Sequence, residues 1–271
     1  MLRLMIASHH AIVVPPECGF AIWWNNKYGS WSVGNGQPVE FIRDLSQSKK
    51  IETWNLDFQA LLNEILDTRP TDYAALVALV YNAYARRQKP NFKRWGDKNN
   101  FHVRHVADIH ALFPDALFIH IVRDGRDIAC SYRHLNKAKI ESAYAPKLPT
   151  NIDTIANEWR SNLEAVRADF RRLPAGQCCE LRYEDLVRTP VKTLSELCDF
   201  MGESYDPQML EYHLKNRLDS LEPSEFLQWK AKTLIAPDSS ALGKFRTELT
   251  AIEINRFENI AGELLEEYRY I

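Results

Sequence analysis

The chain has 271 residues, of which 45% are hydrophobic and 26% charged, and its formal net charge is -2. This composition is typical of a globular protein with a sizeable core, and the charge argues against general attraction to nucleic acid or to a membrane surface. No apolar run approaches the ~18 residues of a membrane span, and the N-terminus lacks a signal-peptide pattern. The five cysteines have no C-x-x-C spacing, and this odd number favours a reducing, cytoplasmic compartment over a disulfide framework.

The first third of the chain predicts mostly helices. Residues 1–8 carry apolar side chains at helical spacing, and AIVVPPE after them is typical of a short strand that its two prolines end. Residues 22–50 have no clear periodicity and are expected to be irregular. The segment DFQALLNEILDT has one apolar face and predicts a helix, and a second helix is expected to start after Pro70 and to run to about Arg87.

The rest of the chain alternates short apolar strands with helices. In chain order, the predicted elements are a helix at 101–112, a strand at 117–122, helices at 127–135 and 153–171, a strand at CCELRYEDL, and helices that begin at Thr189-Pro190 and at Thr250. Thr189 is expected to cap its helix, which Gly202 ends, and Thr250 with Glu253 has the spacing of a capping box. This alternation predicts an α/β fold with a parallel sheet.

The stretch IHIVRDGRDIACSYRHL is an apolar strand that ends in two arginines and two aspartates and continues as a helix. Ligands of open parallel sheets bind beyond the strands' carboxyl ends, and a helix N-terminus there attracts anions. Arg123 offers a fork suited to phosphate, and Ser131 adds a hydroxyl two turns on. Asp124 and Asp127 are expected to cap the helix. The stretch predicts a phosphate site; the alternative is a surface network in which Arg123 and Arg126 pair with the aspartates.

Other common ligand motifs find little support in the sequence. The segment SVGNGQPV lacks the third glycine and the strand–turn–helix setting of a dinucleotide-binding loop. The His9-His10 pair and the His102-x-x-His105 pair are interpreted as caps, surface residues or core residues. No metal is therefore expected.

Four ordered segments resemble the sulfotransferases that use 3′-phosphoadenosine 5′-phosphosulfate (PAPS). IHIVRDGRDIACSY is similar to their 3′-phosphate-binding motif, in which an Arg at a strand end and a Ser eight positions later hold the phosphate; these correspond to Arg123 and Ser131. The other segments are FKRWGDKNNF, LRYEDLVRTPVKTLSELCDFMG and SALGKF. The resemblance implies that Lys98 touches the transferring sulfuryl group, that Tyr183 lies by the nucleotide and that Lys244 closes over the donor.

The first residues, MLRLMIASHHAIVVPPE, resemble the bacterial and tyrosylprotein branch of this family. The match implies that Glu17 is the general base for an acceptor hydroxyl, while Lys98 stabilises charge on the leaving 3′,5′-bisphosphate. The implied fold is a P-loop-NTPase-like parallel sheet flanked by helices, in a single domain over 1–271 with an acceptor-side helical insertion at 22–92. The implied partners are PAPS and a hydroxyl-bearing acceptor, while the acceptor's identity and the oligomeric state stay open.

The sequence departs from the family at its start. The family's first strand and its loop G-x-P-R-S-G-T-T, which grips the 5′-phosphosulfate, are not found in these residues. One reading is a truncated form of an active enzyme, favoured because Glu17, Lys98, Arg123 and Ser131 are present. Another is a catalytically dead relative that binds a nucleotide or a partner. A nucleotide or small-molecule kinase is a weaker reading, because it also needs a glycine-rich loop.

Overall fold

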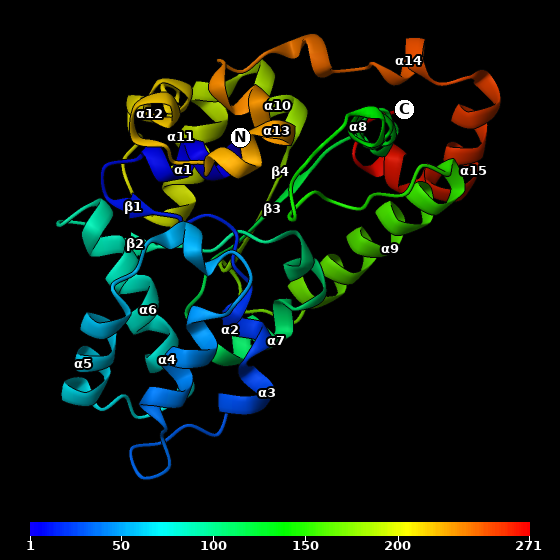
Figure 1. The fold of residues 1–271 in the computed structure, drawn as a ribbon. Helices are drawn as coiled ribbons and strands as arrows, with labels where there is room; N and C mark the ends of the chain where they lie inside the picture. Colours follow the sequence, from blue (N-terminus) through cyan, green and yellow to red (C-terminus); the bar gives the residue numbers. More distant parts are fainter. The chain divides into compact units, whose positions relative to one another are not determined.

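The computed structural model describes residues 1–271 (Figure 1). The chain forms two compact units that interleave along the sequence. The first unit comprises Met1–Ala116 and Asp206–Pro223, and the second comprises Leu117–Tyr205 and Ser224–Ile271. Each unit has a hydrophobic core of its own. The candidate site residues are therefore divided between two separately packed bodies.

Helices dominate the first unit. They are α1 (Leu2–Ser8), α2 (Phe20–Trp23), α3 (Asn25–Tyr28), α4 (Pro38–Ser46), α5 (Phe58–Thr68), α6 (Tyr73–Gln88), α7 (Val106–Leu112) and α12 (Tyr212–Asp219). The carboxylates of Asp57 and Asp72 cap α5 and α6 by accepting a backbone N–H three residues on. The strands β1 (Ile12–Val13) and β2 (Arg94–Trp95) pair in parallel, so their carboxyl ends lie at the same edge.

The connection from α1 to β1 is fixed by a lysine from the end of α6. Lys89 Nζ donates to the carbonyl oxygens of Ala7 at 2.6 Å, His9 at 2.5 Å and Ile12 at 2.7 Å. An ammonium group has three donors, so this side chain satisfies carbonyls that the end of a helix leaves unpaired. Lys89, which is distant from β1 in sequence, thereby fixes the position of this strand.

Buried aromatic side chains fix the segment that follows β1. The indole Nε1 of Trp54 donates to Pro16 O at 2.9 Å, and the hydroxyl of Tyr73 donates to Ala21 O at 3.0 Å. Both rings belong to the core of the first unit. Because these bonds hold the backbone on either side of Glu17, that residue follows β1 in a defined conformation.

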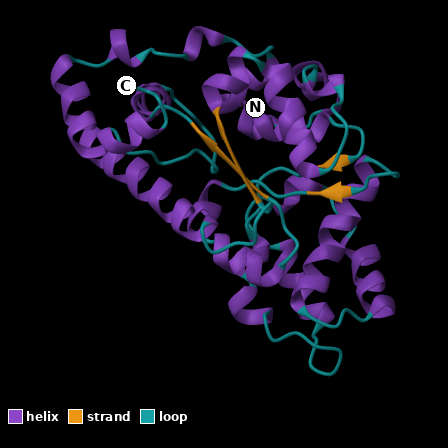
Figure 2. Cartoon of the chain, turned by 180° about the vertical axis from the view of Figure 1, so that it is seen from behind, coloured by secondary structure: helices purple, strands orange, loops and turns teal.

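The second unit contains the longer strands. Its elements are β3 (Phe118–Val122), α8 (Gly125–Lys137), α9 (Ile152–Phe170), β4 (Cys178–Arg182), α10 (Tyr183–Arg188), α11 (Pro190–Met201), α13 (Leu227–Lys230), α14 (Phe245–Glu248) and α15 (Ala251–Glu267). Strands β3 and β4 pair in parallel over their full lengths, with Val122 opposite Arg182 (Figure 2). Loops that follow both strands therefore start at one edge, where ligands of parallel sheets bind.

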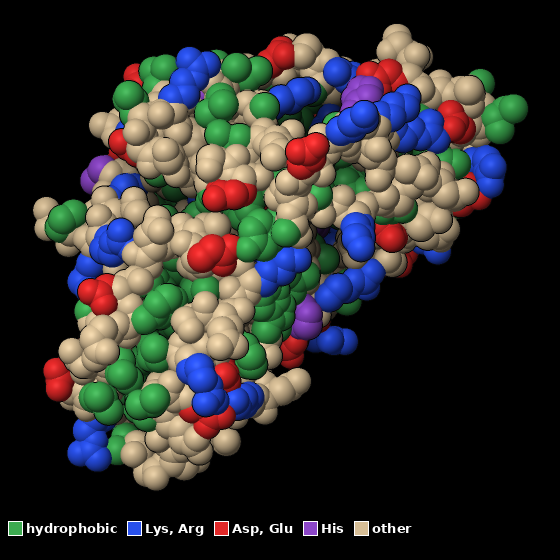
Figure 3. All heavy atoms as spheres, in the orientation of Figure 1, with side chains coloured by type: hydrophobic (Ala, Val, Ile, Leu, Met, Phe, Trp, Pro, Cys, Tyr) green, Lys and Arg blue, Asp and Glu red, His purple; other side chains and the backbone are tan.

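The predicted α/β class with parallel strands is confirmed, and the strands form two separate two-stranded sheets. The capping box of Thr250 and Glu253 is present, and Gly202 ends α11 with a φ of 70°. Thr189 is the N-cap residue of α11 and Pro190 its first residue, as predicted, but the Thr189 hydroxyl donates to Asp185 O and makes no capping hydrogen bond. Every helix is too short or too polar to cross a lipid bilayer. Basic and acidic side chains are interspersed on the face drawn in Figure 3.

Two other expectations about helices are corrected. The sequence predicts an irregular segment over 22–50, whereas the structure places α3 and α4 there. Helix α3 is too short to display periodicity, and α4 buries only Phe41 and Leu45. The predicted helix after α6 is two elements, a 3-10 turn over Asn100–Arg104 and then α7, which meet at His105.

Candidate functional site

The first unit brings the predicted base and the predicted sulfuryl-contacting lysine together. Glu17 follows β1 and Lys98 follows β2, so the parallel pairing places both beyond the same edge. Lys98 Nζ lies 2.6 Å from Glu17 Oε1, and Lys50 Nζ lies 3.0 Å from Glu17 Oε2. Lys98 also donates to Asn100 Oδ1 at 2.7 Å, and its side chain is 43% exposed. A carboxylate and a partly exposed ammonium group thus share one site.

Asp97 and Asn99, which the sequence analysis missed, hold the backbone on either side of Lys98. Asp97 accepts hydrogen bonds from the Tyr81 hydroxyl at 2.8 Å and from Asn99 Nδ2 at 3.0 Å. Burial raises the pKa of Asp97 to about 6. Asn99 Nδ2 also donates to Cys18 O at 3.3 Å, which ties the loop after β2 to the loop after β1. In the sequence, Asp97 and Asn99 could have been recognised by their positions directly beside Lys98.

His102, whose side chain is 18% exposed, adds a second partly buried group to the same loop. Its Nε2 lies 3.5 Å from Asp97 Oδ2. Burial lowers the pKa of His102 to about 4, so the ring is neutral near pH 7. The loop that presents Lys98 therefore carries a carboxyl group and a neutral imidazole, and neither adds positive charge beside the lysine.

In the second unit, Arg123 lies at the carboxyl end of β3, as predicted. Its guanidinium lies 4.8 Å from the centre of the Tyr183 ring, and its Nη2 donates to Ala241 O at 2.8 Å. The buried Nε of Arg123 has no hydrogen-bond partner. Burial raises the pKa of the Tyr183 hydroxyl, so this ring is neutral near pH 7. The structure brings together Arg123 and Tyr183, and an unpaired donor in this position fits an anionic ligand.

Helix α8 carries Ser131 two turns from its N-terminus, where the hydroxyl is half-buried. The start of this helix was predicted to attract an anion. Asp124 already serves there, since its carboxylate accepts the N–H of Arg126 at 2.9 Å. The expectation that Asp124 caps α8 is confirmed. The N–H of Arg126 is therefore already bonded to Asp124. A phosphate in this region would be contacted mainly by side chains such as that of Arg123.

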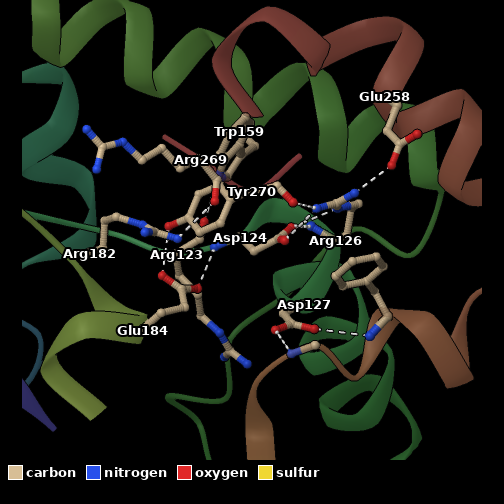
Figure 4. A network of polar contacts seen from close by, with 12 residues as sticks. Arg123, Asp124, Arg126, Asp127, Trp159, Arg182, Glu184, Glu258, Arg269 and Tyr270 are labelled. Atoms are coloured by element: carbon tan, nitrogen blue, oxygen red, sulfur yellow. Dashed lines mark hydrogen bonds and ion pairs between the residues drawn. The ribbon is translucent and has the colours of Figure 1, made fainter. Parts of the chain in front are cut away.

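Arg126 is the centre of a buried network (Figure 4). Its guanidinium pairs with Asp124 at 2.8 Å and with Glu258 at 2.5 Å, and it donates to Tyr270 O at 2.8 Å. It also lies 3.9 Å from the centre of the Phe245 ring. The alternative of an arginine–aspartate network is therefore right for Arg126, although the network is internal and not on the surface.

Asp127 does not cap α8, which corrects the sequence prediction. Its carboxylate accepts the backbone N–H of Gly243 at 2.7 Å and that of Phe245 at 3.0 Å (Figure 4). Gly243 has a φ of 70°, a conformation that favours glycine. Lys244 lies between these two residues, and its Nζ is 4.0 Å from Glu248. The turn that presents Lys244 is thus anchored to the helix that carries Ser131.

The tertiary structure also brings Asp206 to the His9-His10 pair, with possible ligand atoms within 4.8 Å of one another. His10 Nδ1 lies 2.9 Å from Asp206 Oδ2, and the N–H of Ala11 donates to His9 Nδ1 at 3.1 Å. These ring atoms take part in hydrogen bonds within the fold. We assign the three residues a structural role.

Comparison with known proteins points to one family. The model of the sulfotransferase family matches residues 1–207. The chain is 29% identical over 143 residues to an omega-hydroxy-beta-dihydromenaquinone-9 sulfotransferase of Mycobacterium tuberculosis, which covers 51% of this chain and 36% of the relative. It is 24% identical over 161 residues to protein-tyrosine sulfotransferase 2 of Gallus gallus, which covers 59% of this chain and 40% of the relative. The match therefore spans well under half the length of these curated relatives.

Two solved structures share the fold. The sulfotransferase domain from the curacin biosynthetic pathway matches with a TM-score of 0.61 at 18% identity, over 95% of this chain and 91% of that domain. The sulfotransferase domain of the Synechococcus olefin synthase matches with a TM-score of 0.60 at 23% identity, over 95% of this chain and 88% of that domain.

Proposed function

Because the chain belongs to the sulfotransferase family, we propose that it transfers a sulfuryl group from PAPS to the hydroxyl of an acceptor. The observation that carries this proposal is the 2.6 Å contact between Glu17 and Lys98. It places a carboxylate that can take a proton and an ammonium group that can stabilise an anion at the ends of two paired strands.

Glu17 and Lys98 would divide the chemistry between them. The acceptor oxygen forms a bond to sulfur while the bond from sulfur to the bisphosphate oxygen breaks, and the acceptor proton passes to the Glu17 carboxylate. Lys98, which is partly exposed, would turn from Glu17 toward the leaving oxygen and stabilise its negative charge. Positioning and charge stabilisation dominate such in-line transfers, and neither step calls for a metal.

Four residues of the second unit would hold the donor. Arg123, whose buried Nε has no partner, would bind the 3′-phosphate together with the Ser131 hydroxyl. Tyr183, which already stacks on Arg123, would lie beside the adenosine. Lys244 would approach the donor from its anchored turn.

The first prediction separates donor binding from chemistry. Arg123→Ala removes a charge-assisted contact of roughly 1.5–3 kcal/mol, so the full-length protein should bind adenosine 3′,5′-bisphosphate about 10- to 150-fold more weakly. Glu17→Gln should lower kcat while the bisphosphate Kd is largely retained. Calorimetry with the bisphosphate and transfer of radiolabelled sulfate from PAPS measure the two effects.

The matched control is Arg172→Ala, since the Arg172 side chain is 77% exposed in the same unit as Arg123. This variant should change neither the Kd for the bisphosphate nor kcat. Failure of the full-length protein to bind PAPS or the bisphosphate would refute the proposed function. An unchanged kcat in Glu17→Gln would remove Glu17 as the base.

A further inference from the structure

The turn from β3 to α8 carries Arg123, and side chains from other elements hold its backbone. The indole Nε1 of Trp159, on α9, donates to Arg123 O at 3.0 Å. The N–H of the next residue, Asp124, donates to Glu184 Oε1 at 3.0 Å. The backbone that follows the Arg123 side chain is therefore fixed by residues of α9 and α10.

The same turn is closely packed on one side. A Cβ at Gly125 would lie 2.4 Å from the Phe257 ring and 2.9 Å from the Trp159 ring. Both distances are shorter than a real side chain allows, so glycine permits this close approach. Figure 4 draws the turn between Trp159 and Glu184. Aromatic rings hold one side of the turn, and the other side depends on Glu184.

Glu184 is a carboxylate at the start of α10 that is only 5% exposed. Its Oε1 accepts the N–H of Asp124, and its Oε2 accepts the hydroxyl of Tyr270 at 2.8 Å (Figure 4). Both donors are neutral. Burying a carboxylate costs free energy that an apolar side chain of similar size would not. Packing alone therefore does not account for a glutamate at this position.

Tyr270 contacts the chain on both sides of Arg123. Its hydroxyl lies 2.8 Å from Glu184 Oε2 and 3.4 Å from Val122 O. Its own carbonyl oxygen accepts from Arg126 Nη2 at 2.8 Å. Burial raises the pKa of Tyr270, so the hydroxyl keeps its proton near pH 7 and donates to the carboxylate. This single residue therefore braces the turn before and after Arg123.

The guanidinium of Arg123 relies on this backbone for its position. Its Nη2 donates to Ala241 O, whereas its buried Nε has no hydrogen-bond partner. The ring of Tyr183 lies 4.8 Å from the guanidinium, and Tyr183 directly precedes Glu184 in the chain. Adjacent residues of α10 thus contact the Arg123 side chain and hold the backbone beside it. A cation that is in place before its anion arrives loses less freedom on binding.

We propose that Glu184 and Tyr270 are positioning residues for the donor. Glu184, oriented by the Tyr270 hydroxyl, fixes the N–H of Asp124 and so presets the Arg123 guanidinium to receive the 3′-phosphate. Neither positioning residue touches the donor. The inference rests on the proposed function and identifies which residues outside the donor contact set its affinity.

The contribution of the 3′-phosphate is measured as a ratio of two dissociation constants. Calorimetry on the full-length protein gives Kd for adenosine 3′,5′-bisphosphate and for adenosine 5′-monophosphate, which lacks that phosphate. Glu184→Gln should weaken bisphosphate binding about 5- to 30-fold and Tyr270→Phe about 3- to 10-fold, because each removes a hydrogen bond that holds the turn. Kd for the monophosphate should change less than about twofold.

The sign of the Glu184→Gln effect separates positioning from electrostatics. This change removes a negative charge beside the turn, which by itself would tighten the binding of an anion. Weaker bisphosphate binding therefore reports a displaced Arg123. Tighter or unchanged binding in Glu184→Gln would overturn the inference. Tyr270→Phe leaves the charge unchanged and supplies the test if Glu184→Gln does not fold.

The second unit offers a matched pair of controls. Tyr268 donates to Glu180 Oε1 at 2.7 Å, and Glu180 contacts His120 on β3 in place of the turn. Tyr268→Phe and Glu180→Gln remove an equivalent tyrosine–glutamate bond, so they should lower stability in urea by a similar amount while the ratio of the two Kd values stays constant. A ratio that falls as far in these controls would mean a general loss of packing and would overturn the inference.

A double-mutant cycle with Arg123→Ala identifies the route of the effect. In that background Glu184→Gln should leave the ratio of the two Kd values unchanged, because the side chain that it positions is gone. A further fall of the same size as in the wild-type background would contradict positioning through Arg123.

Transfer of radiolabelled sulfate from PAPS keeps the two proposals distinguishable. A protein that transfers sulfate, and whose ratio is unchanged in Glu184→Gln and Tyr270→Phe, refutes the positioning role and leaves the proposed function standing. A ratio that falls in both variants of a protein that transfers no sulfate supports the positioning role and refutes the proposed function. A wild-type protein that binds no bisphosphate refutes both.

Discussion

Asp97 is a carboxyl group whose state is set by competition between burial and hydrogen bonding. The Tyr81 hydroxyl and Asn99 Nδ2 stabilise its charged form, but desolvation is larger and raises its pKa to about 6. Near neutral pH the group is ionised in the fold at a cost in stability. The hydrogen bond between Asn99 and Asp97 flanks Lys98, the residue that we propose stabilises the charge on the leaving group.

This balance predicts how stability depends on pH. The pKa of Asp97 is raised from 3.8 to about 6 in the fold, so its contribution to stability is fully present below pH 3.8 and is lost as pH rises through 6. The unfolding free energy of Asp97→Asn should therefore rise, relative to that of the wild type, by up to about 3 kcal/mol between pH 4 and pH 7. Urea denaturation of both proteins across that range measures the difference.

Asp67→Asn is the control for Asp97→Asn, because Asp67 is exposed on α5 of the same unit. The stability difference for this control should stay flat over the same pH range. A flat difference for Asp97→Asn as well would mean that the Asp97 carboxyl titrates in the fold as it does in the unfolded chain.

At the scale of elements, helix α8 joins two parts of the candidate donor site. The helix carries Ser131, and from its first turn Asp127 reaches the turn that presents Lys244. A carboxylate near a helix N-terminus is also stabilised by the helix dipole. A single aspartate thus links the helix that carries Ser131 to the turn of Lys244, more than 100 positions away in sequence.

Removing this link should loosen the Lys244 turn. Asp127→Ala leaves two backbone N–H groups without an acceptor, so we expect a loss of roughly 2–4 kcal/mol in unfolding free energy and faster amide exchange at Gly243 and Phe245. Bisphosphate binding should weaken as the turn loses its position. Asp127→Asn, which keeps one acceptor oxygen, should have a smaller effect on both.

Asp153→Ala is the matched control for Asp127→Ala. Asp153 also lies in the first turn of a helix, α9, but its side chain is 34% exposed and pairs with Arg256. Its removal should leave exchange at Gly243 and Phe245 unchanged. If Asp127→Ala also leaves exchange there unchanged, the link does not hold the turn.

At the scale of the whole chain, the first unit is closed by residues from its two distant segments. Arg3 pairs with Glu222 at 2.7 Å and donates to Val14 O at 3.0 Å and to Leu221 O at 2.9 Å. The side chains of the pair are 6% and 3% exposed. Helix α12 packs on α1 around this pair. The segment at 206–223 is therefore part of the first unit's core structure and not a loop of the second.

Breaking this buried pair should be more harmful than replacing it. Arg3→Met leaves Glu222 buried without its cationic partner and should cost about 3–5 kcal/mol in unfolding free energy, whereas Arg3→Met with Glu222→Leu should recover much of that loss. Chemical denaturation measures both, with Arg43→Met, at a side chain 62% exposed, as the control. If Arg3→Met alone is as stable as Arg3→Met with Glu222→Leu, the two side chains are not a coupled buried pair.

The sequence by itself determined the elements that local physics specifies. Amphipathic spacing identified α5, α6, α9 and α15, and short apolar runs identified β3 and β4. The cap at Thr250 and the stop at Gly202 followed from side chains that act within one turn. The sequence also predicted Arg123 as a site residue from its position at a strand end, and Glu17 and Lys98 from the resemblance of their segments to the sulfotransferase family.

The tertiary structure alone decided which of these residues meet. Glu17 contacts Lys98, 81 positions away in sequence, because β1 and β2 pair in parallel, and Arg123 stacks on Tyr183 because β4 lies beside β3. Asp127 was misassigned as a cap because its true partners are 116 and 118 positions away. Pairing and packing are cooperative, long-range events, so a local pattern can name a side chain and its strand end without naming its partner.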